Sequence, residues 1–160
     1  FRELTGKARR SVISRRPEGE MRHGFRMSVG AQPGAVREVS AAFAELAEEH
    51  ALPADVRRSI NVALDELVAN AHSHGQTGSE PHSVTVEVKA DPESVTVIFT
   101  DDGAPFDPFE RDSPDTTLSV EEREIGGLGI HLVSKLMDQV SYERREGQNV
   151  VVLVKKLVNG

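Results

Sequence analysis

Apolar and polar positions follow regular periods from about residue 25 onward, and no internal repeat interrupts them. Residues 25–29 predict a short strand. After the Pro33-Gly34 pair, apolar residues recur at helical spacing and predict a helix: Val36, Val39, Phe43 and Leu46. Pro53 suits the first turn of a second helix, because the N–H group that proline lacks has no partner there in any case.

The second half of the chain contains strand-like alternation. Apolar residues occupy every second position in 84–88 and 95–99, and Asp91-Pro92 between them predicts a tight turn. Residues 107–125 are polar and lack a period, so we expect a long loop that is either a functional lid or disordered. A helix from about 128 to 138 and two strands joined at Gly147 follow. This order predicts an α+β fold with helices on one face of a largely antiparallel sheet.

The composition limits the class of protein. A chain of 160 residues with 38% hydrophobic residues has room for one core and about one domain. It contains no cysteine, which excludes disulfides and thiolate chemistry. No apolar run approaches the roughly 20 residues that cross a bilayer, and no signal-peptide pattern opens the chain. We therefore expect a soluble, cytoplasmic protein.

Charge divides the chain into two parts. The first 23 residues carry seven Arg or Lys and three Glu, which leaves the remainder at −11 within a total net charge of −7. An acidic body argues against a nucleic-acid groove as the main activity. We therefore predict a basic, partly disordered arm at residues 1–24 and a folded domain at residues 25–160.

The predicted second helix carries polar side chains beside its apolar stripe, in SINVALDELVANAHSHG (residues 59–75). Glu66 and Asn70 are four residues apart, so they lie one above the other at the edge of the core face, whereas Asp65 points away from it. An Asn oxygen can ligate a hard cation, and a Glu can accept a hydroxyl proton. Taken alone, the pair is more typical of a solvated helix flank. The core face itself is predicted to comprise Val56, Ile60, Leu64, Leu67 and Ala71.

Two further motifs follow predicted elements. TDDGAPFDP (residues 100–108) ends an apolar strand, where an Asp can accept from an exocyclic amine and Gly103 lets a flat ring approach the backbone. EIGGLGIHLV (residues 124–133) places three glycines before a helix, an arrangement whose free N–H groups favour phosphate. Each motif, taken alone, is also compatible with an ordinary loop. The glycine motif matches neither the Walker A pattern nor the G-x-G-x-x-G dinucleotide pattern.

In this order, the three motifs resemble those of the GHKL ATPase superfamily, which shares the Bergerat nucleotide-binding fold. ELVANA (66–71) resembles its N box, DDGAPF (101–106) its first glycine box and GGLG (126–129) its second. The run GGLGIHLVSKLMDQVSYERREGQNVVVLVKK and the stretch NAHSHG are most similar to the bacterial anti-sigma-factor serine/threonine kinases. The resemblance covers about residues 25–157. It implies a two-layer α/β sandwich with helices on one face of a mixed, mostly antiparallel sheet.

The resemblance also implies roles for individual residues. Glu66 is expected to be the catalytic base, and Asn70 to bind the Mg²⁺ that bridges the phosphates of ATP. Asp101 is expected to accept from the adenine amino group, with Gly103 making room for the ring. The remaining nucleotide contacts are expected at the lid hinge, the helix end and the last strand: His74, Arg123, Gly126, Gly127, Leu128, Gly129 and Asn149. Arg123 is the candidate for the γ-phosphate, and His74 either contacts the phosphates or completes the helix end. Asn149 stands near the position where some relatives carry a threonine that contacts the base.

The partners implied by the resemblance are a sigma factor, a STAS-domain anti-anti-sigma protein that is phosphorylated on serine, and a second copy of the chain. Three other functions remain open from the sequence. The same fold serves as a nucleotide-dependent switch that regulates another signalling protein, such as a phosphatase. It also serves as the catalytic domain of sensor histidine kinases, for which the 24 residues before the first predicted strand leave too little room for a phosphoacceptor hairpin. The third alternative is a non-enzymatic domain that binds ATP but in which Glu66 has no catalytic role.

Overall fold

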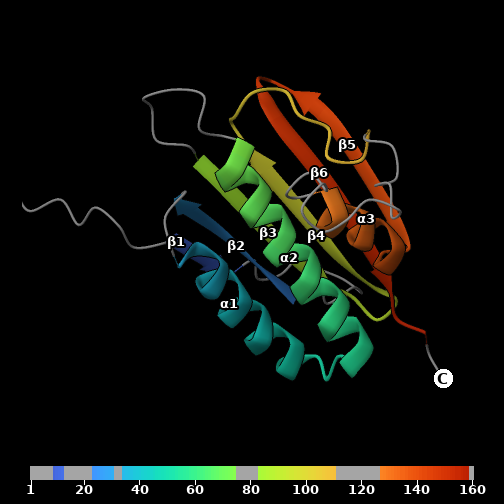
Figure 1. The fold of residues 1–160 in the computed structure, drawn as a ribbon. Coiled ribbons are helices and arrows are strands. Elements are labelled where there is room, and N and C mark those ends of the chain that lie inside the picture. Colours follow the sequence, from blue (N-terminus) through green and yellow to red (C-terminus); the bar gives the residue numbers. More distant parts are fainter. Residues whose placement is uncertain (1–8, 13–22, 31–33, 75–82, 111–126, 159–160) are drawn as a thin grey trace, which may run out of the picture.

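The computed structural model describes residues 9–12, 23–30, 34–74, 83–110 and 127–158 (Figure 1). Within these ranges, six strands form one sheet in the order β1-β2-β3-β4-β6-β5, and three helices lie together on one face of it. The elements are β1 (Arg9–Val12), β2 (His23–Gly30), α1 (Ala35–Glu49), α2 (Ala54–His74), β3 (Ser83–Ala90), β4 (Ser94–Asp101), α3 (Gly127–Leu136), β5 (Gln139–Arg145) and β6 (Gln148–Lys156).

The hydrophobic core lies between the sheet and the helix layer. Helix α2 occupies the middle of that layer and contacts both α1 and α3 (Figure 1). Its predicted apolar stripe is confirmed, because all five of its residues are at most 7% exposed. Strands β3 and β4 alternate as predicted and bury every second residue against the helices: Val84, Val86 and Val88, and Val95, Val97 and Phe99. The α+β fold and its two layers are therefore confirmed.

The junction between α1 and α2 is fixed by one side chain. Arg57 donates from Nε to the Leu52 carbonyl at 2.7 Å and from Nη2 to the Ala47 carbonyl at 2.9 Å. The Ala47 carbonyl lies in the last turn of α1, where it also accepts from the Leu52 N–H, and Leu52 lies in the link between the two helices. Pro53 lies directly before α2, and its carbonyl accepts the Arg57 N–H, so it stands one residue outside the first turn predicted for it. The junction helps to orient α2, whose second half contains Glu66 and Asn70.

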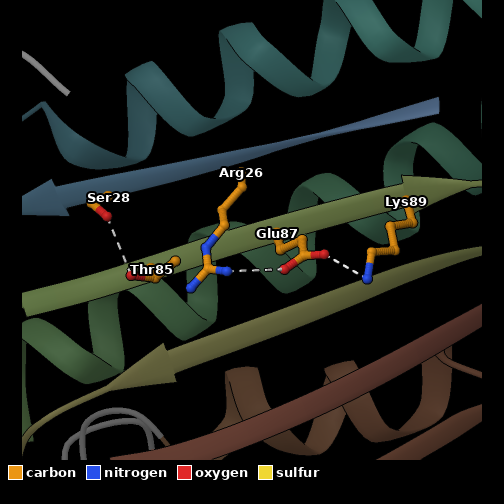
Figure 2. Close-up of polar contacts among 5 residues, drawn as sticks. All are labelled: Arg26, Ser28, Thr85, Glu87 and Lys89. Carbon is orange, nitrogen blue, oxygen red and sulfur yellow. Dashed lines mark hydrogen bonds and ion pairs between the residues drawn. The ribbon is translucent and has the colours of Figure 1, made fainter. Parts of the chain in front are cut away.

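The face of the sheet opposite the helices is polar on β2 and β3 (Figure 2). Arg26 lies directly across from Glu87, and the two side chains form an ion pair at 3.9 Å. Glu87 also pairs with Lys89 at 2.5 Å, and the Ser28 and Thr85 hydroxyls are hydrogen-bonded at 3.3 Å. The Arg26–Glu87 and Ser28–Thr85 pairs join β2 to β3, and such cross-strand pairs favour one register. They thereby keep the apolar positions of both strands on the helix side.

The structure differs from the sequence predictions in three respects. A mixed, mostly antiparallel sheet was expected, but every strand pair in the described ranges is antiparallel. Arg9–Val12 forms β1 and pairs with β2, whereas no strand was predicted in the basic arm. Helix α3 begins at Gly127 and ends at Leu136, close to the predicted bounds, so Gly127 lies inside the helix rather than in a turn before it. The turn at Gly147 is confirmed, since Glu146 (φ 50°) and Gly147 (φ 77°) have the left-handed conformation of a two-residue hairpin turn.

Residues 107–110 of the predicted long loop have no regular structure, and residues 111–126 lie outside the described ranges. No helix in the part of the chain that the structure describes has the length and hydropathy of a membrane span.

Candidate functional site

A pocket opens between the second half of α2, the end of β4 with the loop after it, and the start of β6. Its volume is about 380 Å³, including the part open to solvent. Apolar side chains form its floor, and four residues predicted for the site lie in its wall: Asn70, Asp101, Gly103 and Asn149. An apolar pocket with a few convergent polar groups is the usual form of a small-molecule site. The structure thus brings together residues from two motifs and the last strand that are up to 79 positions apart in the chain.

Asn70 brings an unsatisfied polar atom to this pocket. It lies one helical turn beyond Glu66 and next to Ala71, which belongs to the buried stripe of α2. Its Nδ2 atom is buried and has no hydrogen-bond partner among the residues that the structure describes. Buried side-chain amides are nearly always hydrogen-bonded, because an unpaired one loses its hydration without compensation. The Asn70 amide is therefore suited to an acceptor supplied by a ligand.

Glu66 lies where α2 meets the start of α3. A Cβ atom built on Gly129 falls 1.7 Å from Oε2 of Glu66 and 2.1 Å from its Cδ, so the carboxylate rests against the backbone of α3. Only glycine permits this approach. Gly129 was predicted to contribute to a turn, but it lies within the first turn of α3 and has no positive φ. A Cβ atom at this position is excluded by the Glu66 side chain of α2 as it lies in the structure, not by the conformation of the α3 backbone.

The two aspartates at the end of β4 have different surroundings. Asp101 lines the pocket, and its Oδ1 accepts from the Gly103 N–H at 2.9 Å and from Asn149 Nδ2 at 3.0 Å. Asp102 is exposed, and its Oδ1 accepts from the Ser83 N–H at 2.9 Å, which ties the loop to the start of β3. The sequence favoured Asp101 as the ligand-facing acid, and its position in the pocket is consistent with that choice.

Some predicted site residues are not placed by the structure. Arg123 and Gly126 lie outside the described residues, and so do the side chains of His74 and Leu128. Gly127 is the first residue of α3. In the ranges that the structure describes, no three His, Asp or Glu side chains are grouped so that they could hold a metal ion. The roles predicted for Arg123, Gly126, His74 and Leu128 therefore remain predictions.

Sequence reasoning missed two side chains of β5 that support the site. Tyr142 and Arg144 both bond to Oδ1 of Asn149, at 2.8 and 3.0 Å, and Arg144 also bonds to the Gly103 carbonyl at 2.8 Å. The available signal was their spacing of two residues, which places both on one face of the strand after α3, and Arg144 lies directly opposite Asn149. Their partners depend on strand pairing, which alternation alone does not specify.

Comparison with known proteins gives consistent matches. The model of the histidine kinase-like ATPase domain family matches residues 29–155. The chain is similar to the serine/threonine-protein kinase BtrW of Bordetella bronchiseptica, with 30% identity over 100 residues, which are 62% of this chain and 70% of that protein. It is also similar to the serine-protein kinase RsbW of Bacillus subtilis, with 27% identity over 139 residues, which are 84% of this chain and 85% of that protein. The RsbW of Listeria monocytogenes is 32% identical over 97 residues, which are 58% of this chain and 62% of that protein.

Proposed function

The chain belongs to the histidine kinase-like ATPase domain family, within the group of anti-sigma-factor serine kinases, and on that premise we propose that it transfers the γ-phosphoryl group of ATP to a serine of a partner protein. The observation that carries this proposal is the pocket that unites Asn70, Asp101 and Gly103, with Glu66 one helical turn from Asn70. Residues of the first two motifs line this pocket, and Gly129 of the third lies against Glu66.

The pocket residues fit a purine nucleoside triphosphate. The Asp101 carboxylate accepts from the adenine amino group, and the apolar floor of Leu67, Phe99 and Val151 covers the ring. Asn70 faces the phosphates: its Oδ1 is a suitable Mg²⁺ ligand, and the unpaired Nδ2 can donate to a phosphate oxygen. The N-terminus of α3, with Gly127, is suited to the phosphate chain because free N–H groups and the helix dipole favour anions. His74, Arg123, Gly126 and Leu128 are proposed for the same end of the nucleotide.

The reaction depends mainly on positioning and charge neutralisation, as in other phosphoryl transfers. Glu66 accepts the proton of the attacking serine hydroxyl as the oxygen bonds to the γ-phosphorus and ADP leaves. Mg²⁺, when bound with ATP, neutralises charge on the phosphates. The contact with Gly129 places the Glu66 carboxylate at the start of α3, beside the helix end proposed to hold the phosphates. Glu66 and Asn70 are therefore the proposed base and metal ligand on one helix.

The proposed acceptor is a STAS-domain anti-anti-sigma protein, and the proposed second partner is a sigma factor held in the cytoplasm while ATP is bound. Binding of the unphosphorylated STAS protein then releases the sigma factor. This exchange is limited by the difference in affinity of each partner for the two nucleotide states. The resemblance to anti-sigma-factor kinases supports this assignment and a two-fold dimer.

Labelling tests the reaction and its base together. The chain is mixed with Mg²⁺, ATP labelled at the γ-phosphorus, and STAS-domain proteins encoded near its gene, and the labelled residue is mapped. Glu66→Ala is expected to abolish labelling of serine while ATP binding stays near normal. Asp65→Ala is the matched control, since Asp65 is the adjacent carboxylate, is exposed and bonds to Ser40. Labelling by Glu66→Ala at the wild-type rate refutes the assigned base, and failure to capture a sigma factor in ATP favours regulation of another partner.

A further inference from the structure

Asn149 is a buried polar residue whose hydrogen-bonding capacity is taken up by the protein itself. It is 3% exposed at the start of β6. Its Nδ2 donates to Asp101 Oδ1 at 3.0 Å and to the Ala104 carbonyl at 2.8 Å, which uses both of its N–H groups. Its Oδ1 accepts from Tyr142, Arg144 and the Phe106 N–H. A direct contact between this side chain and a ligand would require one of these bonds to break.

These bonds tie the β5-β6 hairpin to the loop after β4. Arg144, Asn149 and Asp101 lie in one row across β5, β6 and β4, because each is directly paired with the next. Asn149 holds the loop at Ala104 and Phe106, and Arg144 donates to the Gly103 carbonyl at 2.8 Å. The row therefore holds three residues of the loop that lines one side of the pocket, Gly103, Ala104 and Phe106.

The same row orients the acid of the pocket. Asp101 Oδ1 receives two donors, the Asn149 amide and the Gly103 N–H, so rotation of the carboxylate would break both bonds. Hydrogen bonds inside a partly buried network reinforce one another, and loss of one partner leaves the others unsatisfied. An acid held in this way presents a fixed acceptor to a ring that lies in the pocket.

We propose that Asn149, supported by Tyr142 and Arg144, is a positioning residue that makes the pocket selective for purine nucleotides with an amino group at carbon 6. This inference rests on the proposed ATP-binding function and adds residues on β5 and β6 to it. A held carboxylate accepts from a 6-amino group, repels a 6-oxo group, and gains nothing from a purine without a substituent at that carbon. Asn149 acts through Asp101 and the loop rather than through the ring.

Selectivity is measured as a ratio of dissociation constants, which separates positioning from general damage to the fold. Calorimetry on the full chain with Mg²⁺ gives Kd for ATP, for inosine triphosphate with its 6-oxo group, and for purine riboside triphosphate with hydrogen at carbon 6. The wild-type protein is expected to prefer ATP over purine riboside triphosphate by about tenfold or more, the range for a hydrogen bond to a charged group. A variant that only loosens the fold weakens all three nucleotides alike.

Three variants and one matched control probe the row. Asn149→Asp replaces a donor to Asp101 with a second carboxylate, and it is expected to reduce the preference for ATP to about threefold or less. Tyr142→Phe removes one bond and Arg144→Ala removes two from the edge strand β5. Both variants are expected to fold more readily than Asn149→Asp and to reduce the preference by about threefold. Arg145→Ala is the control, because Arg145 follows Arg144 on β5 but pairs with Glu143 instead.

The outcomes separate this inference from the proposed function. A preference for ATP that falls in the three variants and stays within about twofold of wild type in Arg145→Ala supports the positioning role. Wild-type binding of ATP with an unchanged ratio in Arg144→Ala and Tyr142→Phe refutes it and leaves the proposed function intact. Equal weakening of all three nucleotides also refutes it. If the wild-type protein binds none of the nucleotides, both proposals fail together.

Discussion

Replacing Gly129 with Ala tests how closely α3 approaches the proposed catalytic base. A methyl group at this position would lie 1.7 Å from Oε2 of Glu66, so the methyl and the carboxylate cannot both occupy these positions. The carboxylate ends a flexible side chain, whereas the helix backbone is held by the core contacts of Ile130 and Val133. We therefore expect Glu66 to rotate away while α2 and α3 stay in place.

Two opposing terms set the effect of this substitution on stability. Alanine is more favourable than glycine inside a helix by about 0.5–1 kcal/mol. Forcing the Glu66 side chain from its preferred rotamer costs about 0.5–1.5 kcal/mol. The net change in the free energy of unfolding should therefore lie within about 1 kcal/mol of zero. In a Glu66→Ala background the second term disappears, so the same substitution should stabilise the protein by the full helical term.

Urea denaturation of the four proteins in this double-mutant cycle measures the coupling, which is expected to be about 1 kcal/mol. Phosphorylation of the partner serine by Gly129→Ala should fall by about a hundredfold or more, because a displaced base loses its alignment with the hydroxyl. Additive stabilities within about 0.3 kcal/mol, together with phosphorylation at the wild-type rate, would refute the close approach and the role assigned to Glu66.

Three further substitutions test other parts of the structure. Asn70→Ala is expected to weaken ATP binding by about tenfold or more while leaving the free protein equally or more stable, because it removes an unpaired buried amide. Calorimetry measures the binding and urea denaturation the stability, and a large loss of stability would contradict the reasoning. Arg57→Ala should lower the free energy of unfolding by about 1–2 kcal/mol through its two lost carbonyl bonds, with Kd for ATP unchanged. Asp138→Asn should lower it by about 0.5 kcal/mol at pH 7, since the side chain is 36% exposed. The hydrogen bond from the Lys156 N–H, followed by the charge of Lys155, lowers the pKa of the Asp138 carboxyl below 3.8. The stabilisation by this carboxylate is therefore present above about pH 4 and is lost as the pH falls through the folded pKa. A stability difference between wild type and Asp138→Asn that grows below about pH 4 would contradict this pH dependence.

Elements with a long, regular period could be predicted from the sequence. The apolar stripe of α2 and the alternating valines of β3 and β4 are each specified by many residues that agree, and all of them are buried as expected. Strand β1 is different, because the four residues RRSV carry no alternation and become a strand only by pairing with β2. Its existence is a tertiary effect that local sequence does not encode.

The candidate site shows the same division. The sequence indicated Asn70 and Asp101 because they stand in motifs whose order resembles the nucleotide-binding boxes of a known family. It did not indicate how Asn149 acts, since its bond to Asp101 depends on the register between β4 and β6, which are separated by the whole of α3 and β5. The close approach of Gly129 to Glu66 likewise depends on how the Glu66 side chain of α2 lies against α3. Residues that act through contacts distant in the chain were therefore the ones that sequence reasoning missed or misread.

The central claim is that Asn70, Asp101 and the start of α3 surround one nucleotide. Titration of the full chain with ATP and Mg²⁺ in a calorimeter, beside Asp101→Asn and the neighbouring control Asp102→Asn, tests it most directly. The account predicts saturable binding of one ATP per chain that is strongly weakened in Asp101→Asn and largely retained in Asp102→Asn. Absence of saturable heat from the folded wild-type protein, or equal binding by the two variants, would contradict it.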